Sequence, residues 1–332
     1  MNRLLSIPML VVFVCSAALI TSCNQDDGDK GLDVPSTYTF SRNGSSTVSY
    51  SGQTERLNML SLMSTYMKTS NTIGSTPLDA QRLKDMFANE NDPFTGATFQ
   101  KNLKSKCFQP DVVTYEAYMD RLAVSSQATG AASEGTAGVL VDGSSDPTVG
   151  YRVDENGVEM IQVIEKGLIG AVFLYQAMEV YLSADRMGTV GNDDIVHGEN
   201  YTDMEHYFDE AFGYFGVPVD FPTNTTDVKW WGTYCNRRNN DLYPGINDEI
   251  ATAFRTARAA IVAKDDEARD EAIRTVQEKW AIVCAATAVD YMLQALDPDI
   301  TVYKKHHALS EGIGFMNSLK YHFNGGNSKF PP

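Results

Sequence analysis

The stretches HYFDEAFGYF (206–215) and HALSEGIGFM (307–316) share the frame H-x-x-x-E-x-x-G-aromatic, although they lie far apart in the chain. On a helix, this spacing puts the histidine and the glutamate of each stretch on one face. The glycine one turn later leaves room for another helix to approach closely. The repeat indicates an internal duplication, with one His-carboxylate pair in each copy.

The duplication extends upstream, because QVIEKGLIGAVFLYQAMEVYL (162–182) and TVQEKWAIVCAATAVDYMLQAL (275–296) are both long apolar helix patterns with a Glu-Lys dipeptide near the start. Each half thus repeats a long helix, a loop and a His helix. The sequence predicts a mainly α protein of two related helical bundles with small β-hairpin additions. The first bundle is expected over 38–218 and the second over 247–332, with 219–246 as an aromatic-rich connector.

Apolar periodicity and helix-end signals place the individual helices. The expected helices are 53–68, 78–90, 111–124, 160–183, 203–215, 247–264, 267–296 and 303–323. Thr202 and Glu205 form a capping box at the start of the first His helix, and Gly216 with Pro218 ends it. The His helices are therefore the best delimited elements.

Strand signals are few. Segments 38–50 and 149–161 each predict a hairpin around an Asn-Gly pair. Segment 125–147 is rich in Gly, Ser and Ala, which predicts a mobile surface loop.

The N-terminus has the pattern of a lipoprotein signal peptide, which we assign to residues 1–22. Arg3 precedes an apolar run that is too short for a comfortable membrane span, and the run ends in Ser22-Cys23. Cleavage after Ser22 leaves Cys23 acylated, which anchors the protein in a membrane.

Residues 23–37 are polar and acidic and predict a short disordered tether. Acidic residues directly behind the lipidated cysteine resemble the surface-export signal of Bacteroidota lipoproteins. The sequence therefore predicts a lipid-anchored protein of the cell outer membrane that is exposed at the surface.

The charge argues against nucleic acid as a partner, and the cysteine content argues against a thiolate zinc site. The chain has 27 basic and 43 acidic side chains, a formal net charge of −16, and a field of that sign repels nucleic acid. Beyond Cys23, the mature chain keeps Cys107, Cys235 and Cys284, an odd number without a C-x-x-C pattern. A thiolate zinc site is therefore not expected.

The connector carries large aromatic and basic side chains. Trp230, Trp231, Tyr234, Arg237 and Arg238 are candidates to line a ligand cleft at the seam between the bundles. The same side chains are also suited to seal the interface between the bundles, since large aromatics usually pack.

The candidate metal ligands are His206, Asp209, Glu210, His307 and Glu311. Helical bundles commonly hold metal ions with such side chains from facing helices. If the halves pack around a pseudo-twofold axis, the set offers two imidazoles and up to three carboxylates, which suits a divalent metal such as zinc, iron or manganese. In the alternative interpretation, each histidine is satisfied by the glutamate one turn away within its own bundle, and no metal binds.

The His frames and the duplication resemble the imelysin-like proteins, helical cell-envelope proteins named for a Gly-x-His-x-x-Glu motif. The match is partial, because Met204 replaces the glycine and Glu210 lies four rather than three residues after His206. The phrases YTFSRNGSSTVSYSGQTERLNML, YTDMEHYFDEAFGYFG and HALSEGIGFMNSL resemble a family of Bacteroidota lipoproteins, domain of unknown function 4856, over nearly the whole mature chain. The imelysin-like resemblance implies iron or metal uptake, with an outer-membrane uptake partner, and a peptidase activity.

Together these observations predict a surface lipoprotein that binds a ligand, a metal ion or an iron carrier, at the seam between the bundles. A metal-dependent peptidase is one alternative, although the motifs H-E-x-x-H, G-x-S-x-G and G-x-x-x-x-G-K are absent and no catalytic residue is assigned. A structural or adhesive surface module without a small-molecule site is the other alternative.

Overall fold

The computed structural model describes residues 31–141, 146–324 and 327–328. The signal peptide, the lipidated Cys23 and the first part of the tether lie outside these residues, so their assignments stay predictions. Residues 32–332 form one compact unit. No helix in the described ranges is both long enough and apolar enough to span a bilayer.

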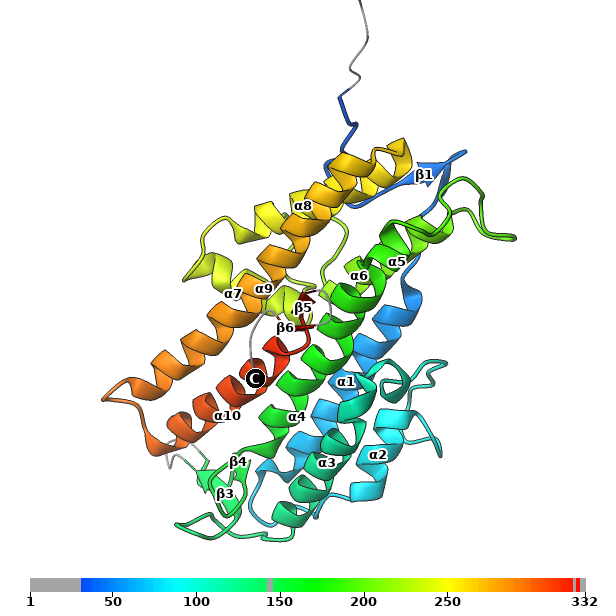
Figure 1. Ribbon diagram of the computed structural model, residues 1–332. Coiled ribbons are helices and arrows are strands. Elements are labelled where there is room, and N and C mark those ends of the chain that lie inside the picture. The colour runs from blue at the N-terminus through cyan, green and yellow to red at the C-terminus, as the bar shows by residue number, and fades with distance from the viewer. Residues whose placement is uncertain (1–30, 142–145, 325–326, 329–332) are drawn as a thin grey trace, which may run out of the picture. The chain divides into compact units, whose positions relative to one another are not determined.

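The described chain is mainly helical, as predicted (Figure 1). Its helices are α1 (Ser51–Lys68), α2 (Ala80–Ala88), α3 (Val112–Ser126), α4 (Met160–Leu168), α5 (Ala184–Met187), α6 (Asp203–Phe215), α7 (Trp231–Asn240), α8 (Ile246–Ala263), α9 (Asp266–Leu296) and α10 (Val302–Leu319), with 3-10 turns at Thr69–Asn71, Lys104–Lys106 and Gln109–Asp111. Every expected helix is present, with ends within a few residues of the prediction. The capping box of Thr202 and Glu205 at the start of α6 is confirmed.

α4 continues as one helical rod through two π-helical segments, Ile169–Leu174 and Gln176–Tyr181. Every residue of α4 and of the first π segment is buried. A helix that is covered on all sides runs through the interior of its domain, which explains why this stretch is apolar almost throughout.

Two helices were not expected. The short α5 follows the helix expected at 160–183, and α7 lies inside the connector, for which no regular structure was predicted. The polar composition of α7 hides its helical spacing. The buried residues Trp231, Cys235 and Arg238 fall at i, i+4 and i+7, which places them on one face of the helix.

The N-terminal hairpin is confirmed. β1 (Ser41–Arg42) pairs antiparallel with β2 (Ser45–Ser46). Asn43 and Gly44 form the turn, both with positive φ, as a two-residue hairpin turn requires.

The hairpin predicted at 149–161 is wrong. β4 (Gly150–Val153) pairs with β3 (Gly138–Val141), which comes from the segment predicted to be a mobile loop. After the turn at Gly157 the chain enters α4, so no second strand follows. The strand Gly138–Val141 was missed because it is short and lies among small, polar residues that are typical of loops. A third pair joins β5 (Phe323–Asn324) and β6 (Asn327–Ser328).

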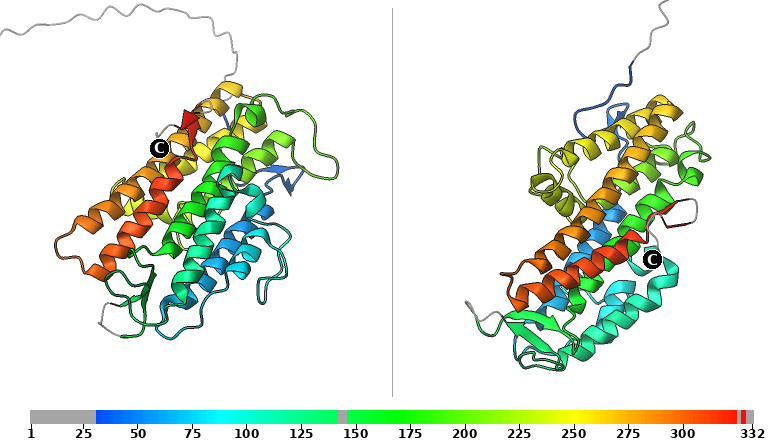
Figure 2. Two further views of the ribbon diagram at one scale, coloured as in Figure 1. Left: turned by 60° about the horizontal axis from the view of Figure 1, so that its bottom comes forward. Right: turned by 60° about the vertical axis from the view of Figure 1, so that its left-hand side comes forward.

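Both halves place the His helix against the long helix before it. α6 packs on the π segment Gln176–Tyr181, and α10 packs along α9. However, α10 also packs along α4, and α6 along α8, so helices of one half lie against helices of the other (Figure 2). The predicted first bundle, connector and second bundle thus pack on one another within one compact unit, and the division into two bundles stays a prediction.

Aromatic rings fill the core where the halves meet. Trp280 packs edge to face on Phe215, with 4.8 Å between ring centroids, and on Trp231 at 6.2 Å. Trp231 also meets Phe315 at 5.8 Å. All four rings are fully buried. Edge-to-face pairs of this kind add to the stability that burial alone gives.

The glycine of each His frame permits a close helix contact. A Cβ on Gly213 would lie 2.7 Å from Cβ of Tyr50, and a Cβ on Gly314 would lie 2.5 Å from Cβ of Lys166. Both distances are shorter than side-chain carbons tolerate. The predicted close approach is therefore confirmed, for α6 against the start of α1 and for α10 against α4.

Gly314→Ala is expected to lower the free energy of unfolding by about 1–3 kcal/mol, because the methyl group overpacks the contact between α4 and α10. In an uncrowded helix the same change would stabilise the protein. Urea denaturation measures the effect. Gly191→Ala is the control, since nothing lies within 4 Å of its added Cβ. Equal stabilities of the two variants would contradict the close contact.

Candidate functional site

The first His-carboxylate pair holds α6 against the segment that leads into α1. His206 Nδ1 lies 3.1 Å from the carbonyl oxygen of Ser49, and the ring stacks on Tyr201 at 4.5 Å between centroids. Glu210 accepts a hydrogen bond from Gln53 Nε2 at 2.7 Å. The pair thus makes its contacts with backbone and neutral side chains.

Asp209 and Glu205 share a buried arginine. Arg258 of α8 lies 3.0 Å from Asp209 through Nε and 3.0 Å from Glu205 through Nη1. Tyr38 also donates to Asp209 at 2.8 Å, and Arg42 lies 3.0 Å from Glu205. Burial raises the pKa of Asp209 to about 6 against the opposing charge of Arg258. This cluster is closed within the protein and joins α6 to α8.

The second histidine lies between two carboxylates. His307 Nδ1 is 2.6 Å from Glu159, and Nε2 is 3.4 Å from Glu311, while the ring stacks on Tyr151 at 4.1 Å between centroids. Burial disfavours the charged ring, but the hydrogen bond with Glu159 and the two negative charges outweigh it and raise the pKa of His307. In the protonated form both ring nitrogens donate, which leaves no lone pair for a metal ion.

Further charges continue this arrangement across α10, α4 and α1. Glu311 lies 3.2 Å from Lys166 Nζ, which lies 2.9 Å from Glu165, and Glu165 lies 2.8 Å from Lys68 Nζ. Anionic and cationic groups alternate along the series. We call it the charge chain, in the order Glu159, His307, Glu311, Lys166, Glu165 and Lys68.

Pairing outweighs desolvation at the centre of the charge chain. Burial disfavours the ammonium of Lys166, yet Glu165 and Glu311 hold the pKa of Lys166 well above its ordinary value. Burial likewise works against the carboxylate of Glu165, but Lys166 and Lys68 lower the pKa of Glu165 to about 2. At the end of the chain, burial raises the pKa of Glu159.

The charge chain lines a cavity of about 500 Å³, which we call the charged pocket. Three of the five cleft candidates from the connector, Trp230, Tyr234 and Arg237, also line it. The structure therefore brings the second His-Glu pair and part of the connector into one site.

The other two cleft candidates have structural contacts. Trp231 is fully buried and donates from Nε1 to the carbonyl oxygen of Ile169 at 2.8 Å. Arg238 is buried and pairs with Asp241 at 2.7 Å and Asp290 at 2.9 Å. Both side chains therefore make contacts between elements of the fold and do not line the charged pocket.

Two further cations at the charged pocket have neutral partners. Lys229 Nζ bonds Asn58 Oδ1 at 2.6 Å, and Arg237 Nη1 bonds the hydroxyl of Tyr291 at 3.1 Å. Among the described residues, no carboxylate lies within 4.0 Å of either cation. Between them in sequence, Trp230 has a φ of +47°, a strained conformation of the kind found at functional sites.

The five predicted metal ligands lie in two different surroundings. His206, Asp209 and Glu210 belong to the contacts of α6, while His307 and Glu311 belong to the charge chain. In the described part of the chain, no group of three or more His, Cys, Asp or Glu side chains is arranged to hold a metal ion. A site shared by both His helices gains no support from this arrangement, and metal binding stays a prediction.

Sequence reasoning missed several residues of the charged pocket: Lys68, Glu159, Glu165, Lys166 and Lys229. The sequence did contain a signal for these residues. Glu165 and Lys166 are adjacent charged residues inside the long apolar stretch 162–182. Charged side chains are buried only when they are paired. A buried ion pair was therefore to be expected at this point.

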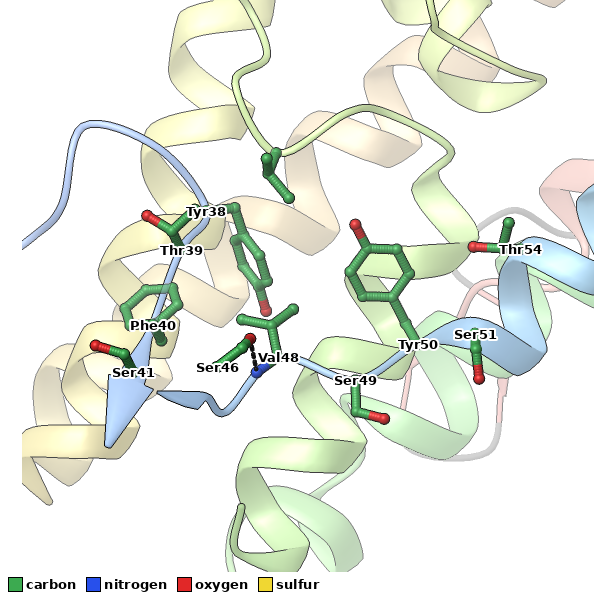
Figure 3. A pocket seen from close by; sticks show the side chains of 11 residues that line it. Tyr38, Thr39, Phe40, Ser41, Ser46, Val48, Ser49, Tyr50, Ser51 and Thr54 are labelled. Carbon is green, nitrogen blue, oxygen red and sulfur yellow. Dashed lines mark hydrogen bonds between the residues drawn. The ribbon is translucent and has the colours of Figure 1, made fainter. Parts of the chain in front are cut away.

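A second cavity, of about 580 Å³, lies beside the N-terminal hairpin (Figure 3). Tyr38, Val48 and Tyr50 line it together with hydroxyl side chains such as Ser49 and Thr54. None of the described residues that line it is charged. It offers less chemistry than the charged pocket, which we take as the candidate site.

Comparisons with known proteins identify one family. A family model described as "Domain of unknown function (DUF4856)" matches residues 35–330. No curated protein and no solved structure matches the chain. The predicted Bacteroidota origin and the imelysin-like relationship gain no support from this match and stay predictions.

Proposed function

Because the chain belongs to the DUF4856 family, whose description names no activity, we propose its function from the charged pocket: the protein binds a small organic anion there. The single observation that carries this proposal is the surplus of positive charge at the pocket. Its lining has four lysine or arginine side chains against three glutamates, and His307 adds a further positive charge when protonated.

The distribution of these charges favours an anion over a cation. The three glutamates are already matched within the charge chain by Lys68, Lys166 and His307. Lys229 and Arg237 hydrogen-bond only to neutral partners, and Glu311 acts on Arg237 without forming an ion pair with it, so we take both charges as available to a ligand. The chain as a whole carries −16, which makes a locally positive pocket a specific feature. Trp230 and Tyr234 add aromatic surface for the apolar part of a ligand.

The charge of the pocket also separates the two ligands that the sequence suggested. A bare divalent ion would meet an excess of cations and an imidazole whose nitrogens both face carboxylates. An iron carrier of the carboxylate type, which is an anionic chelate, has the complementary charge. We therefore propose that an anionic iron carrier is a candidate ligand, and that the free metal ion is not.

The proposed cellular setting follows the sequence. We propose that Cys23 is acylated, that the anchor holds the protein at the outer membrane, and that an uptake partner there receives the ligand. The polar, acidic composition of the segment behind Cys23 supports this proposal, because it suits a tether between a lipid anchor and a folded body.

Titration calorimetry with citrate, ferric citrate, inorganic phosphate and Zn²⁺ tests the proposal. We expect an organic anion to bind, and the double variant Lys229→Ala, Arg237→Ala to weaken its binding at least about tenfold, because two charge-assisted contacts are lost. Lys84→Ala is the matched control, since Lys84 pairs with Asp120 on the surface and does not line the pocket.

The alternatives predict different results. Tight binding of Zn²⁺ alone, undiminished in the double variant, would favour the metal site over the anion site. Cleavage of a protein substrate that a chelator abolishes would favour the peptidase. If no anion binds, or if the double variant binds as tightly as the unchanged protein, the proposed function fails.

A further inference from the structure

An exposed apolar surface lies on the hairpin of α9 and α10. Of the twelve large apolar side chains that are exposed in the described part of the chain, six lie on these two helices, so the apolar surface is concentrated there. Leu296 is 75% exposed and Val302 is 64% exposed. We call the six residues the outer seam: Val289, Leu293 and Leu296 on α9, and Val302, Leu309 and Met316 on α10. Large exposed apolar patches mark sites of interaction.

The spacing of the outer seam is that of a helix-packing surface. On α9 the residues follow at steps of four and three, from Val289 through Leu293 to Leu296. On α10 they recur at intervals of seven. This is the heptad pattern, which presents a straight row of side chains to a second helix that has the same repeat.

The two rows lie side by side on the face that points away from the core. Met292 fills the gap between the helices, because its methyl group occupies the space beside Gly312 of α10. Leu293 is the next residue after Met292, so its side chain is turned by about 100° around the helix axis. Leu293 therefore lies roughly opposite Tyr291, which is buried. Figure 2 shows α9 and α10 next to each other in both views. A single helix pair can therefore cover both rows.

We propose that the outer seam is an interface between two copies of this chain, in which two α9–α10 hairpins pack into a four-helix arrangement. The partner must present two adjacent helices with heptad rows of matching length. The exposed row on α10 is roughly 21 Å long at 1.5 Å per residue and the exposed row on α9 roughly 11 Å, but the partly buried Ile282 and Ala286 extend the α9 row to roughly 21 Å. A second hairpin thus matches the first.

Charges at the end of the hairpin support a second copy as the occupant. Asp297 and Asp299 follow α9, while Lys304 and Lys305 begin α10, and all four are exposed. Within the described residues none of them has an ion-pair partner. A twofold axis along the hairpin places α9 of one copy on α10 of the other, which brings the aspartates of each copy to the lysines of its partner. An anionic membrane lacks this complementarity, because the aspartates oppose it.

Sedimentation equilibrium of residues 32–332, which form a compact unit with their own core, tests the proposal. We expect a dimer over a range of protein concentrations. The double variant Leu293→Glu, Leu309→Glu should weaken association at least about 100-fold, because two central side chains of the interface become charged. Val113→Glu, at a 70% exposed apolar position on α3, is the control and should remain dimeric.

The melting temperature of each variant separates loss of association from loss of folding. If the first double variant unfolds, Leu296→Glu, Val302→Glu replaces it, since these two positions are the most exposed of the outer seam. A monomer at every concentration, or a dimer that both double variants leave intact, would overturn the proposal. A monomer that binds vesicles of phosphatidylcholine and phosphatidylglycerol through the outer seam would overturn the proposal as well. Anion binding by the monomeric variant shows that the charged pocket does not depend on this interface.

Discussion

Replacing Arg258 with alanine is expected to lower the free energy of unfolding by about 3–5 kcal/mol, because a buried ion cluster loses its central cation. The guanidinium is fully buried and lies 3.0 Å from both Asp209 and Glu205. Arg42 remains near Glu205, but Asp209 keeps only neutral donors. Without Arg258, Asp209 must either stay ionised without a countercharge in the interior or take up a proton at neutral pH, and either outcome is destabilising.

Urea denaturation of the variant measures this loss. Arg255→Ala is the matched control, since Arg255 lies one turn earlier on α8 and its guanidinium bonds only the hydroxyl of Thr252. We expect the control to lose less than about 1 kcal/mol. Similar losses in the two variants would show that the ion cluster does not hold α6 to α8.

Lys166→Ala is expected to have an effect of similar size, about 3–5 kcal/mol at neutral pH. Lys166 is buried between Glu165 and Glu311, at 2.9 Å and 3.2 Å. Without it the two carboxylates face each other across a cavity, with Lys68 and His307 as the remaining countercharges. The charged pocket should lose its shape as well as its balance of charge.

The effect of Lys166→Ala should depend on pH. In the unchanged protein the pKa of Glu165 is lowered to about 2, so Glu165 contributes stability that is present above its unfolded pKa and is lost as the pH falls towards 2. The variant lacks one of the two cations that lower this pKa, so Glu165 takes up its proton at higher pH. The difference in stability between the two proteins is therefore largest near neutral pH and shrinks in acid.

Denaturation curves at several pH values check this expectation, with Lys84→Ala as the control. Lys84 and Asp120 form a partly exposed pair at 2.7 Å, which contributes about 0–1 kcal/mol. A loss for Lys166→Ala that stays constant from neutral pH into acid would contradict the role of Lys166 in the charge chain.

The sequence predicted the structure best where a single local rule determines it. The ends of α6 follow from a capping box and a left-handed glycine, and both are local. The glycines of the His frames correctly indicated close helix contacts, because the missing side chain has few other uses inside a helix. The long apolar pattern at 160–183 likewise predicted a helix, and its first part proves to be buried on all sides.

The sequence was least informative where distant segments decide the outcome. β3 forms because β4 offers a partner, and a short strand has no periodicity of its own. The pairing of Lys166 with Glu311 joins α4 to α10, which no spacing along the chain reveals. For the same reason, the sequence could place His307 on a helix face but could not show that Glu159 would be its closest partner.

The π-helical winding within Ile169–Tyr181 affects how the predicted internal duplication relates to the structure. A π turn takes more residues than the 3.6 of an α turn, so each such turn rotates the following side chains relative to an α-helix of the same sequence. α9 is α-helical over its whole length and undergoes no such rotation. The sequence repeat predicts that the two long helices were once equivalent, but residues beyond the π turns lie at a different helical phase from their counterparts in α9. A repeat in sequence therefore need not be a repeat in space.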